Sequence, residues 1–215
     1  IRRPQVYLLD EPLTNLDARL RASMRAELKK LQKDLGQTTI YVTHDQLEAM
    51  TMADKIAVTD QGVLEQYDTP ENIYDHPRNL FVAGFIGSPP MNFIDCTVVH
   101  SNGKLLVDSG EFRLDLSESS EILNRQLSNS EVILAVGPED IITGTQRLSS
   151  DSIHAEVYVM EPTGDQSILS LKIGRHLIKA IVPIFIEVDI GSKVWMDFNR
   201  DRLHIIDRKT GMTII

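Results

Sequence analysis

The sequence predicts an α/β segment followed by an all-β domain, and two observations support this. In residues 1–87, β-rich runs alternate with helical patterns, which is typical of a mostly parallel sheet with helices on it. After residue 88 the helical periodicity fades and short β-rich runs recur, which is typical of a small barrel or sandwich, most of all an OB-like barrel. The turn-forming run Gly87-Ser88-Pro89-Pro90 lies between them, so we predict domains at 1–87 and 88–215.

The first predicted strand is the apolar run Val6–Leu9, which leads directly into Asp10, Glu11 and Pro12. Buried strands of parallel sheets have such unbroken apolar runs, and ligands gather at their carboxyl ends. Two carboxylates at that position suit a magnesium-bound nucleotide. One can hold the metal through water, and the next can take a proton from an attacking water.

The next elements follow from periodicity and capping. Apolar residues that step by three or four from Leu16 to Leu35 predict a helix, with Gly36 as its C-terminal cap. A second strand is predicted at Thr38–Val42. A helix should follow it, because Thr43 and Gln46 have capping-box spacing. Further along, we predict a strand at Lys55–Thr59, a turn at Asp60-Gln61-Gly62 and a helix start at Thr69-Pro70-Glu71.

The second part is predicted to be a series of short strands separated by Gly, Asp and Asn, with one short helix near Glu118–Leu127. The predicted strands are Phe93–Val99, Val132–Val136, Ile153–Met160, Ile168–Ile173, Leu177–Val182, Val194–Phe198 and Leu203–Ile206.

Composition argues against several classes of protein. A net charge of −9 argues against a general nucleic-acid binder, because phosphate backbones require clustered Lys and Arg. The single cysteine, Cys96, cannot form an internal disulfide, which fits a reducing cytosol. No apolar run approaches the roughly 20 residues that span a bilayer. We therefore expect any role at a membrane to be exerted through partner proteins.

Several segments together resemble the ATPase subunit of ATP-binding cassette (ABC) importers, in particular the branch that serves sugars. The segment LLDEPLTNLDARLR (8–21) resembles a Walker B strand and D-loop, and TTIYVTHDQLEAMTMADKIAV (38–58) resembles the H-loop region. Residues 66–93 resemble the connector to the regulatory barrel of that branch, and AVGPEDI (135–141) and HIIDRKTGMTI (204–214) resemble segments of the barrel. The resemblance implies a partial P-loop NTPase sheet followed by an OB-like regulatory domain.

The resemblance assigns roles to individual residues. Asp10 resembles the Walker B aspartate that binds Mg²⁺ through water, and Glu11 resembles the catalytic glutamate that polarises the attacking water. His44 resembles the switch histidine that donates a hydrogen bond to the γ-phosphate of ATP. The D-loop residues are expected to face a second copy of the subunit, or a paralogous subunit, across the dimer interface; they are Asn15, Leu16 and Asp17.

Other charged residues receive structural interpretations. Asp45 and Glu48 are interpreted as helix-capping acids. The basic residues around the first helix, Arg21 among them, are interleaved with acids and are interpreted as a solvated helix face.

The chain also departs from the family pattern. No G-x-x-x-x-G-K-[ST] phosphate loop occurs in the 215 residues, and the Q-loop and signature motif are also missing. The chain opens at Ile1, so we expect it to be the later part of a longer ATPase and inactive alone. Gly137 stands where Arg is expected, and Asp68 stands where Gly is usual. Without earlier strands, the sheet beside Val6–Leu9 is expected to expose apolar side chains.

The family implies partners, a location and a mechanism. ATP and Mg²⁺ would bind between two such subunits, beneath the transmembrane permease subunits at the cytoplasmic face of the membrane. The barrel would stabilise the dimer and offer a surface to a regulatory protein or small molecule. Three alternatives stay open: an importer of polyamine, sulfate or metal, a non-catalytic regulatory and dimerisation module, and an oligonucleotide-binding barrel, which the acidity of the chain disfavours.

Overall fold

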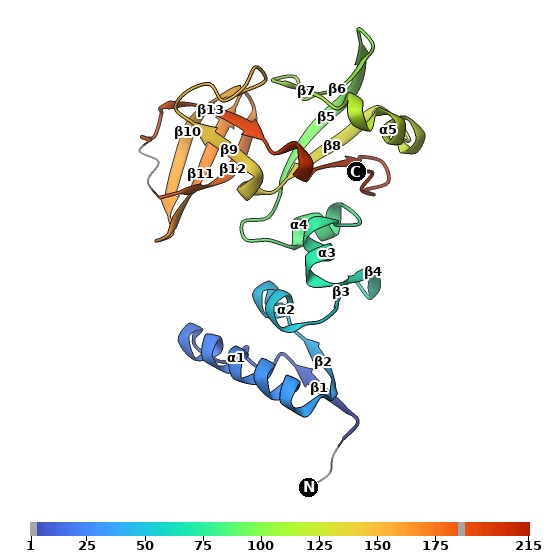
Figure 1. The fold of residues 1–215 in the computed structure, drawn as a ribbon, viewed down its shortest axis with the longest axis vertical. Coiled ribbons are helices and arrows are strands. Elements are labelled where there is room, and N and C mark those ends of the chain that lie inside the picture. Colours follow the sequence, from blue (N-terminus) through green and yellow to red (C-terminus); the bar gives the residue numbers. More distant parts are fainter. Residues whose placement is uncertain (1–3, 185–187) are drawn as a thin grey trace. The chain divides into compact units, whose positions relative to one another are not determined.

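The structure, a computed structural model, describes residues 4–184 and 188–215 (Figure 1). The chain divides into two compact units, Ile1–Ile73 and Tyr74–Ile215. Each unit is described below by itself.

The first unit begins with a strand–helix–strand arrangement. Strand β1 (Val6–Asp10) pairs in parallel with β2 (Thr38–Val42), and helix α1 (Ala18–Leu35) connects them. The register places Asp10 opposite Val42, so the carboxyl ends of both strands lie at one edge of the pair. Gly36 ends α1 in the left-handed region, with φ of 59°, and its N–H donates to the carbonyl of Gln32. The predicted glycine cap is thus confirmed.

The rest of the first unit contains one short helix, a hairpin and the start of a second short helix. Helix α2 (Gln46–Met52) follows β2, and strands β3 (Ile56–Asp60) and β4 (Val63–Asp68) form an antiparallel pair before α3 (Pro70–Asp75). The alternating pattern places the strand at residues 55–59 in a mostly parallel sheet, and this expectation is wrong. Within the described residues, β3 pairs with β4 alone, across a two-residue turn in which Gln61 and Gly62 both have positive φ. Such a turn matches the twist of antiparallel neighbours.

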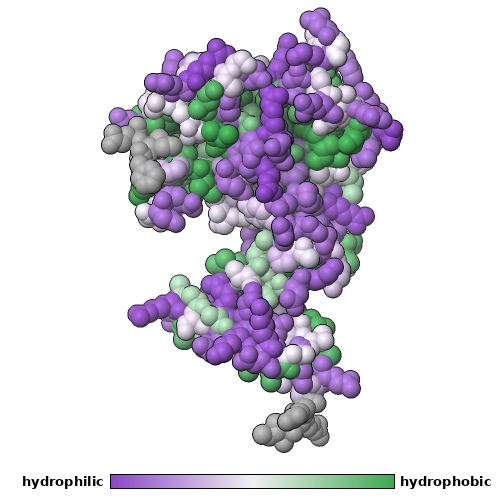
Figure 2. All heavy atoms as spheres, in the orientation of Figure 1, coloured by the Kyte–Doolittle hydropathy of each residue, from purple (hydrophilic) through white to green (hydrophobic). Residues whose placement is uncertain are grey.

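The apolar faces of β1 and β2 are exposed, as the sequence predicts. The exposed fractions are 74% for Leu8 and 54% for Ile40, and Val6 and Val42 are also exposed. No residue of α1 is buried within the described part of the chain. Hydrophobic residues accordingly lie among hydrophilic ones on the surface of this unit (Figure 2). Apolar surface of this kind is normally covered in a stable assembly.

The described residues of the second unit form two five-stranded sheets in which every strand pair is antiparallel. The first has the order β14-β8-β5-β6-β7, and the second has the order β12-β11-β10-β13-β9. This arrangement is consistent with an OB-like barrel. The strands of the first sheet are β5 (Asn92–Ser101), β6 (Lys104–Asp108), β7 (Arg113–Asp115), β8 (Glu131–Val136) and β14 (Leu203–Asp207). Those of the second are β9 (Ile141–Gly144), β10 (Ile153–Pro162), β11 (Gln166–Ile173), β12 (His176–Pro183) and β13 (Lys193–Phe198).

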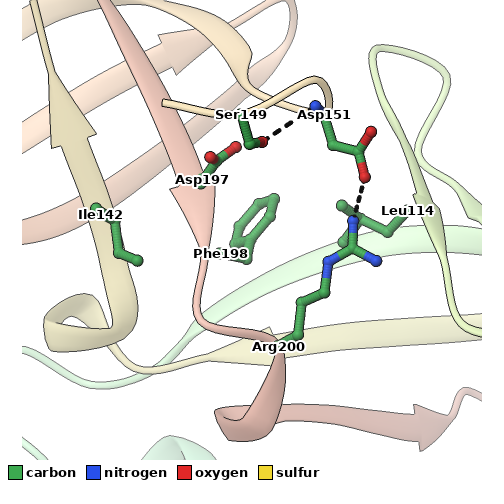
Figure 3. Close-up of a pocket in the computed structure, with 7 residues that line it drawn as sticks. All are labelled: Leu114, Ile142, Ser149, Asp151, Asp197, Phe198 and Arg200. Atoms are coloured by element: carbon green, nitrogen blue, oxygen red, sulfur yellow. Dashed lines mark hydrogen bonds and ion pairs between the residues drawn. The ribbon is translucent and has the colours of Figure 1, made fainter. Parts of the chain in front are cut away.

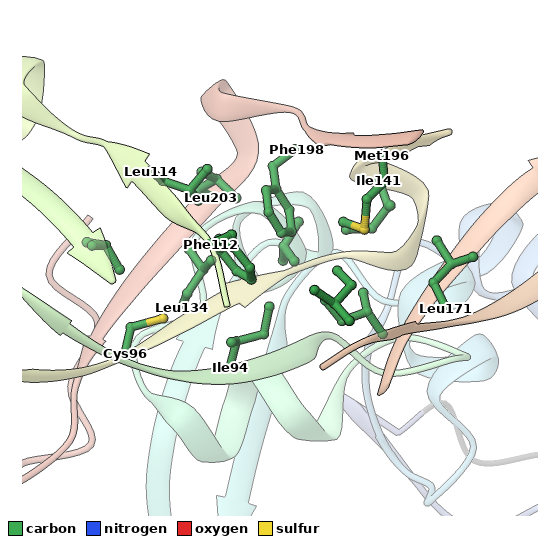
Figure 4. Packing of buried hydrophobic residues seen from close by; sticks show 14 of the residues in the cluster. Ile94, Cys96, Phe112, Leu114, Leu134, Ile141, Leu171, Met196, Phe198 and Leu203 are labelled. Carbon is green, nitrogen blue, oxygen red and sulfur yellow. The ribbon is translucent and has the colours of Figure 1, made fainter. Parts of the chain in front are cut away.

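One hydrophobic core joins these two sheets. Ile94 and Leu134 of the first sheet belong to the same buried cluster as Leu171 and Met196 of the second (Figure 4). All four are at most 1% exposed. Full burial of one such side chain stabilises a protein by roughly 1.5–3 kcal/mol, so this shared core holds the second unit together.

The seven strands predicted for the second part are all present, with small shifts at their ends. The sequence patterns do not predict strands β6, β7 and β9. The predicted short helix is present as α5 (Ser120–Gln126).

Residues 74–87 pack within the second unit, although the sequence assigns them to the first domain. Helix α4 (Leu80–Phe85) is capped by Asn79, and the Leu80 N–H donates to the carbonyl of Gly211 near the C-terminus. Ala83 belongs to a small cluster with residues of β8 and β14. The boundary at residue 88 stays a prediction.

Candidate functional site

The candidate site lies where β1 and β2 end. The ladder continues one residue past β1, because the Glu11 N–H donates to the carbonyl of Val42 over 2.8 Å. Asp10 and Glu11 therefore leave β1 at the same edge at which His44 follows β2. This is the edge where parallel sheets bind their ligands.

Glu11 and His44 are in direct contact. His44 Nδ1 lies 3.0 Å from Glu11 Oε1, and the Thr14 hydroxyl donates to Glu11 Oε2 over 3.2 Å. The hydrogen bonds from His44 and Thr14 lower the pKa of Glu11, so the carboxylate stays charged near neutral pH. Both side chains are open to solvent, 44% exposed for Glu11 and 69% for His44. A charged, accessible carboxylate beside an imidazole can accept a proton from a bound water.

The backbone at Glu11 is unusual. Its φ is 44°, in the left-handed region that residues other than glycine rarely adopt. Such conformations cost about 1–3 kcal/mol and cluster at functional sites. The left-handed residue that directly follows β1 is the predicted catalytic glutamate.

Two hydroxyl groups hold the Glu48 carboxylate beside the turn that carries His44. The Thr43 hydroxyl donates to Glu48 Oε2 over 2.8 Å, and Tyr41 Oη donates to the same oxygen over 2.9 Å. Burial and the nearby Glu48 carboxylate raise the pKa of Tyr41, so its hydroxyl stays protonated and remains a donor. The predicted helix cap at Asp45 is confirmed, because its carboxylate accepts from the N–H groups of Leu47 and Glu48.

Two sequence-based interpretations are corrected at this turn. Thr43 does not cap α2; Asp45 does, two residues further on. Glu48 lies in the first turn of α2, as expected of an acid near a helix N-terminus, but it does not cap the helix: its carboxylate is buried and accepts hydrogen bonds from β2 and from the turn. Thr43 and Asp45 are both good capping residues, so local spacing alone does not decide between them.

The loop after Glu11 contains the three predicted interface residues. Asn15 and Asp17 are exposed and Leu16 is partly buried. Asp17 caps α1, since its Oδ1 accepts from the Leu20 N–H over 2.9 Å. The structure thus assigns Asp17 a role within its own chain, and its interface role stays a prediction.

Arg21 connects this loop to the His44 turn. Its Nη2 donates to the carbonyl of Leu16 over 3.0 Å, and its Nη1 lies 3.7 Å from Asp45 Oδ2. The interpretation of Arg21 as part of a solvated helix face is wrong, because only 34% of its side chain is exposed and both Nη atoms have partners within the chain. Through these two contacts, Arg21 links the loop that follows Glu11 to the turn that carries His44.

Asp17→Ala is expected to destabilise the first unit by about 1 kcal/mol, because it removes the N-terminal cap of α1. Urea denaturation of the 215-residue chain, followed by far-ultraviolet circular dichroism, measures the change. The matched control is Asp34→Ala in the last turn of the same helix, where an acid faces the negative end of the helix dipole and its loss is neutral or mildly stabilising. Equal destabilisation by the two substitutions would contradict the cap.

The second unit contains a separate pocket of about 230 Å³ (Figure 3). Its lining consists of Leu114, Ile142, Ser149, Asp151, Asp197, Phe198 and Arg200. The charged groups are engaged within the chain: Arg200 donates to Asp151 and to the carbonyl of Asp115, and Asp197 accepts from Ser152. None of the predicted site residues lies there.

In the part of the chain that the structure describes, no helix has both the length and the apolar character that crossing a bilayer requires. No group of three or more His, Cys, Asp or Glu side chains gathers there in a way that could hold a metal ion.

The comparisons with known proteins identify relatives along the whole chain. Residues 87–141 match the family described as the MalK OB fold domain. The trehalose/maltose import ATP-binding protein MalK of Thermococcus litoralis is 46% identical over 220 residues, which cover 100% of this chain and 58% of that protein. The xylose/arabinose import ATP-binding protein XacK of Haloferax volcanii is 41% identical over 216 residues, which cover 98% and 55%.

The multiple sugar-binding transport ATP-binding protein MsmK of Streptococcus mutans is 41% identical over 233 residues, which cover 100% of this chain and 60% of that protein. The chain thus spans between 55% and 60% of the length of these three relatives. The resemblance to sugar-import ATP-binding proteins is confirmed.

Proposed function

Because the chain is related along its whole length to ATP-binding subunits of sugar importers, we propose that it forms part of the ATP-hydrolysing subunit that powers an ABC importer, with a sugar as cargo. The observation that carries this proposal is the contact of Glu11 with His44, 3.0 Å apart at the carboxyl ends of two parallel strands. We take β1 and β2 to be part of a P-loop NTPase sheet.

The site residues then have complementary roles. Glu11 holds and polarises the attacking water, since its carboxylate is charged and open to solvent. With both ring nitrogens protonated, His44 would donate from Nδ1 to Glu11 and from Nε2 to the γ-phosphate, so the imidazole would link the phosphate to the Glu11 carboxylate. Asp10, at the end of β1, would hold Mg²⁺ through water. A single carboxylate fits this task, because Mg²⁺ keeps several waters and takes its other ligands from phosphates. Bound Mg²⁺ supplies neutralisation of the phosphate charge.

The assembly extends beyond this chain. Asn15, Leu16 and Asp17 would face a second copy, and ATP would bind between the two subunits. Transmembrane permease subunits would couple closure of this dimer to transport at the cytoplasmic face of the membrane. The second unit would stabilise the dimer and receive a regulatory protein or small molecule. A regulator that binds the open dimer more tightly than the closed one inhibits transport.

The function is tested by transport. The complete subunit, assembled with its permease in proteoliposomes, should import a labelled sugar such as maltose or xylose when ATP is supplied on the subunit's side. Labelled putrescine and sulfate serve as competing cargoes. ATP-dependent uptake of either one, without sugar uptake, would assign the importer to a different cargo class.

The 215-residue chain alone is expected to bind no nucleotide, because its sequence contains no phosphate loop to cradle the phosphates. Titration with a fluorescent magnesium-bound ATP analogue should therefore give no saturable signal. The complete subunit should bind the same analogue with micromolar affinity. Saturable micromolar binding by the 215-residue chain would show that other residues contact the phosphates and would contradict the expectation.

A further inference from the structure

We propose that Glu48 is a positioning residue for His44 and acts through the hydroxyl of Thr43. The inference rests on the proposed function, because it assigns a role to a group that touches neither nucleotide nor metal. The Glu48 carboxylate is buried and takes no part in the proposed hydrolysis itself.

Glu48 is placed to act on the turn. It lies on the first turn of α2 and only 3% of it is exposed. One oxygen, Oε2, accepts both the Tyr41 hydroxyl over 2.9 Å and the Thr43 hydroxyl over 2.8 Å. A buried carboxylate without partners is costly, so these two hydrogen bonds are maintained in the folded chain.

Thr43 transmits this constraint to His44. Its hydroxyl oxygen donates to Glu48 and also accepts from the Asp45 N–H over 2.9 Å. The Thr43 hydroxyl therefore bonds the backbone of the residue that follows His44. The backbone of His44 lies between Thr43 and Asp45, which this hydrogen bond holds together. The His44 side chain is 69% exposed and gains little support from packing. Its direction toward Glu11 Oε1 therefore depends on this turn.

Tyr41 provides a matched comparison. It donates to the same Glu48 oxygen as Thr43, but it lies in β2 and its hydroxyl does not accept the Asp45 N–H. Removing either hydroxyl takes one hydrogen bond from Glu48. Only the loss of the Thr43 hydroxyl also frees the Asp45 N–H. A comparison of the two substitutions therefore distinguishes a role of Glu48 in positioning His44 from a general contribution of the buried carboxylate to stability.

The first experiment measures steady-state ATP hydrolysis by the complete subunit carrying Thr43→Val or Tyr41→Phe. Thr43→Val should lower kcat about tenfold and change the KM for ATP by less than about twofold, because misaligned groups slow chemistry more than binding. Tyr41→Phe should leave both constants within about twofold of the wild type. Equal loss of kcat in the two variants, after correction for the folded fraction, would overturn the proposal.

The second experiment uses Glu48 itself. Glu48→Gln keeps an acceptor oxygen for both hydroxyls, so kcat should stay within about threefold of the wild type. Glu48→Ala removes the acceptor and should lower kcat at least as much as Thr43→Val. Complete loss in Glu48→Gln would identify the charge as the essential property and would overturn a role through hydrogen bonding alone. Wild-type kcat in Glu48→Ala would also overturn the proposal.

The two proposals fail differently. If the wild-type subunit hydrolyses no ATP, the proposed function fails. If it hydrolyses ATP and Thr43→Val is fully active, only the positioning role fails.

Discussion

Glu11→Gln in the complete subunit is expected to abolish ATP turnover while ATP binding is retained. General-base groups contribute about 10²- to 10⁴-fold to rate, and glutamine cannot accept the proton of an attacking water. The amide oxygen can still accept the Thr14 hydroxyl, and the side chain keeps its size, so the loop geometry should survive. We expect kcat to fall at least about 10²-fold with the dissociation constant for ATP nearly unchanged. Phosphate release and binding of a fluorescent ATP analogue measure the two quantities.

The control for this substitution is Glu27→Gln, which makes the same chemical change on the exposed surface of α1. It should leave both turnover and binding unaltered. Turnover near the wild-type rate in Glu11→Gln would remove Glu11 from the catalytic role. It would also leave the left-handed backbone at that residue without a functional reason.

The meeting of Glu11 and His44 could be predicted from the sequence because it depends on topology. Two β-rich runs separated by one helix predict parallel neighbours, and residues after parallel strands meet at one edge. The structure has this pairing, with Asp10 opposite Val42. The side chains that support the pair could not be predicted in the same way. These side chains are Thr14, Arg21 and Glu48. Each lies in a segment where a helix cap or an amphipathic helix already accounts for a polar residue, so the sequence gives no further reason to assign it to the site.

The all-β part could be predicted where its strands are long and apolar. Strand β8 is buried at five consecutive positions, and its apolar run is evident in the sequence. Strand β7 has only three residues, Arg113–Asp115, two of them charged, and alternation cannot be recognised over so short a stretch. The pairing of β3 with β4 is hard to predict for another reason. The sequence predicts the turn between them, but the alternating strand–helix pattern around it favours a parallel sheet.

Asp207, at the end of β14, links the loop after α5 to the turn that follows β14. It is 2% exposed, and its carboxylate accepts from the N–H and hydroxyl of Ser128, the N–H of Lys209, and the N–H and hydroxyl of Thr210. Burial alone would favour the neutral acid. The hydrogen bonds from Ser128 and Thr210 outweigh burial and hold the pKa of Asp207 well below its usual range.

Asp207→Ala is therefore expected to destabilise the second unit by about 3 kcal/mol, because it leaves several buried donors without an acceptor. Asp201→Ala, on the exposed turn before β14, makes the same change without such partners and should cost less than about 0.5 kcal/mol. Urea denaturation at neutral pH, followed by the fluorescence of Trp195 in β13, measures both values. Similar midpoints for the two variants would contradict the role of the network.

The pH dependence of stability provides an independent test of the same carboxylate. Because its pKa is lower in the folded chain than in the unfolded one, the stabilisation is fully present above the unfolded value of about 3.9 and is lost as pH falls below it toward the folded value. The difference in unfolding free energy between the wild type and Asp207→Ala should therefore be constant from about pH 7 to pH 5 and should narrow below about pH 4. A constant difference down to pH 3 would show that lost packing, not the charged carboxylate, accounts for the effect.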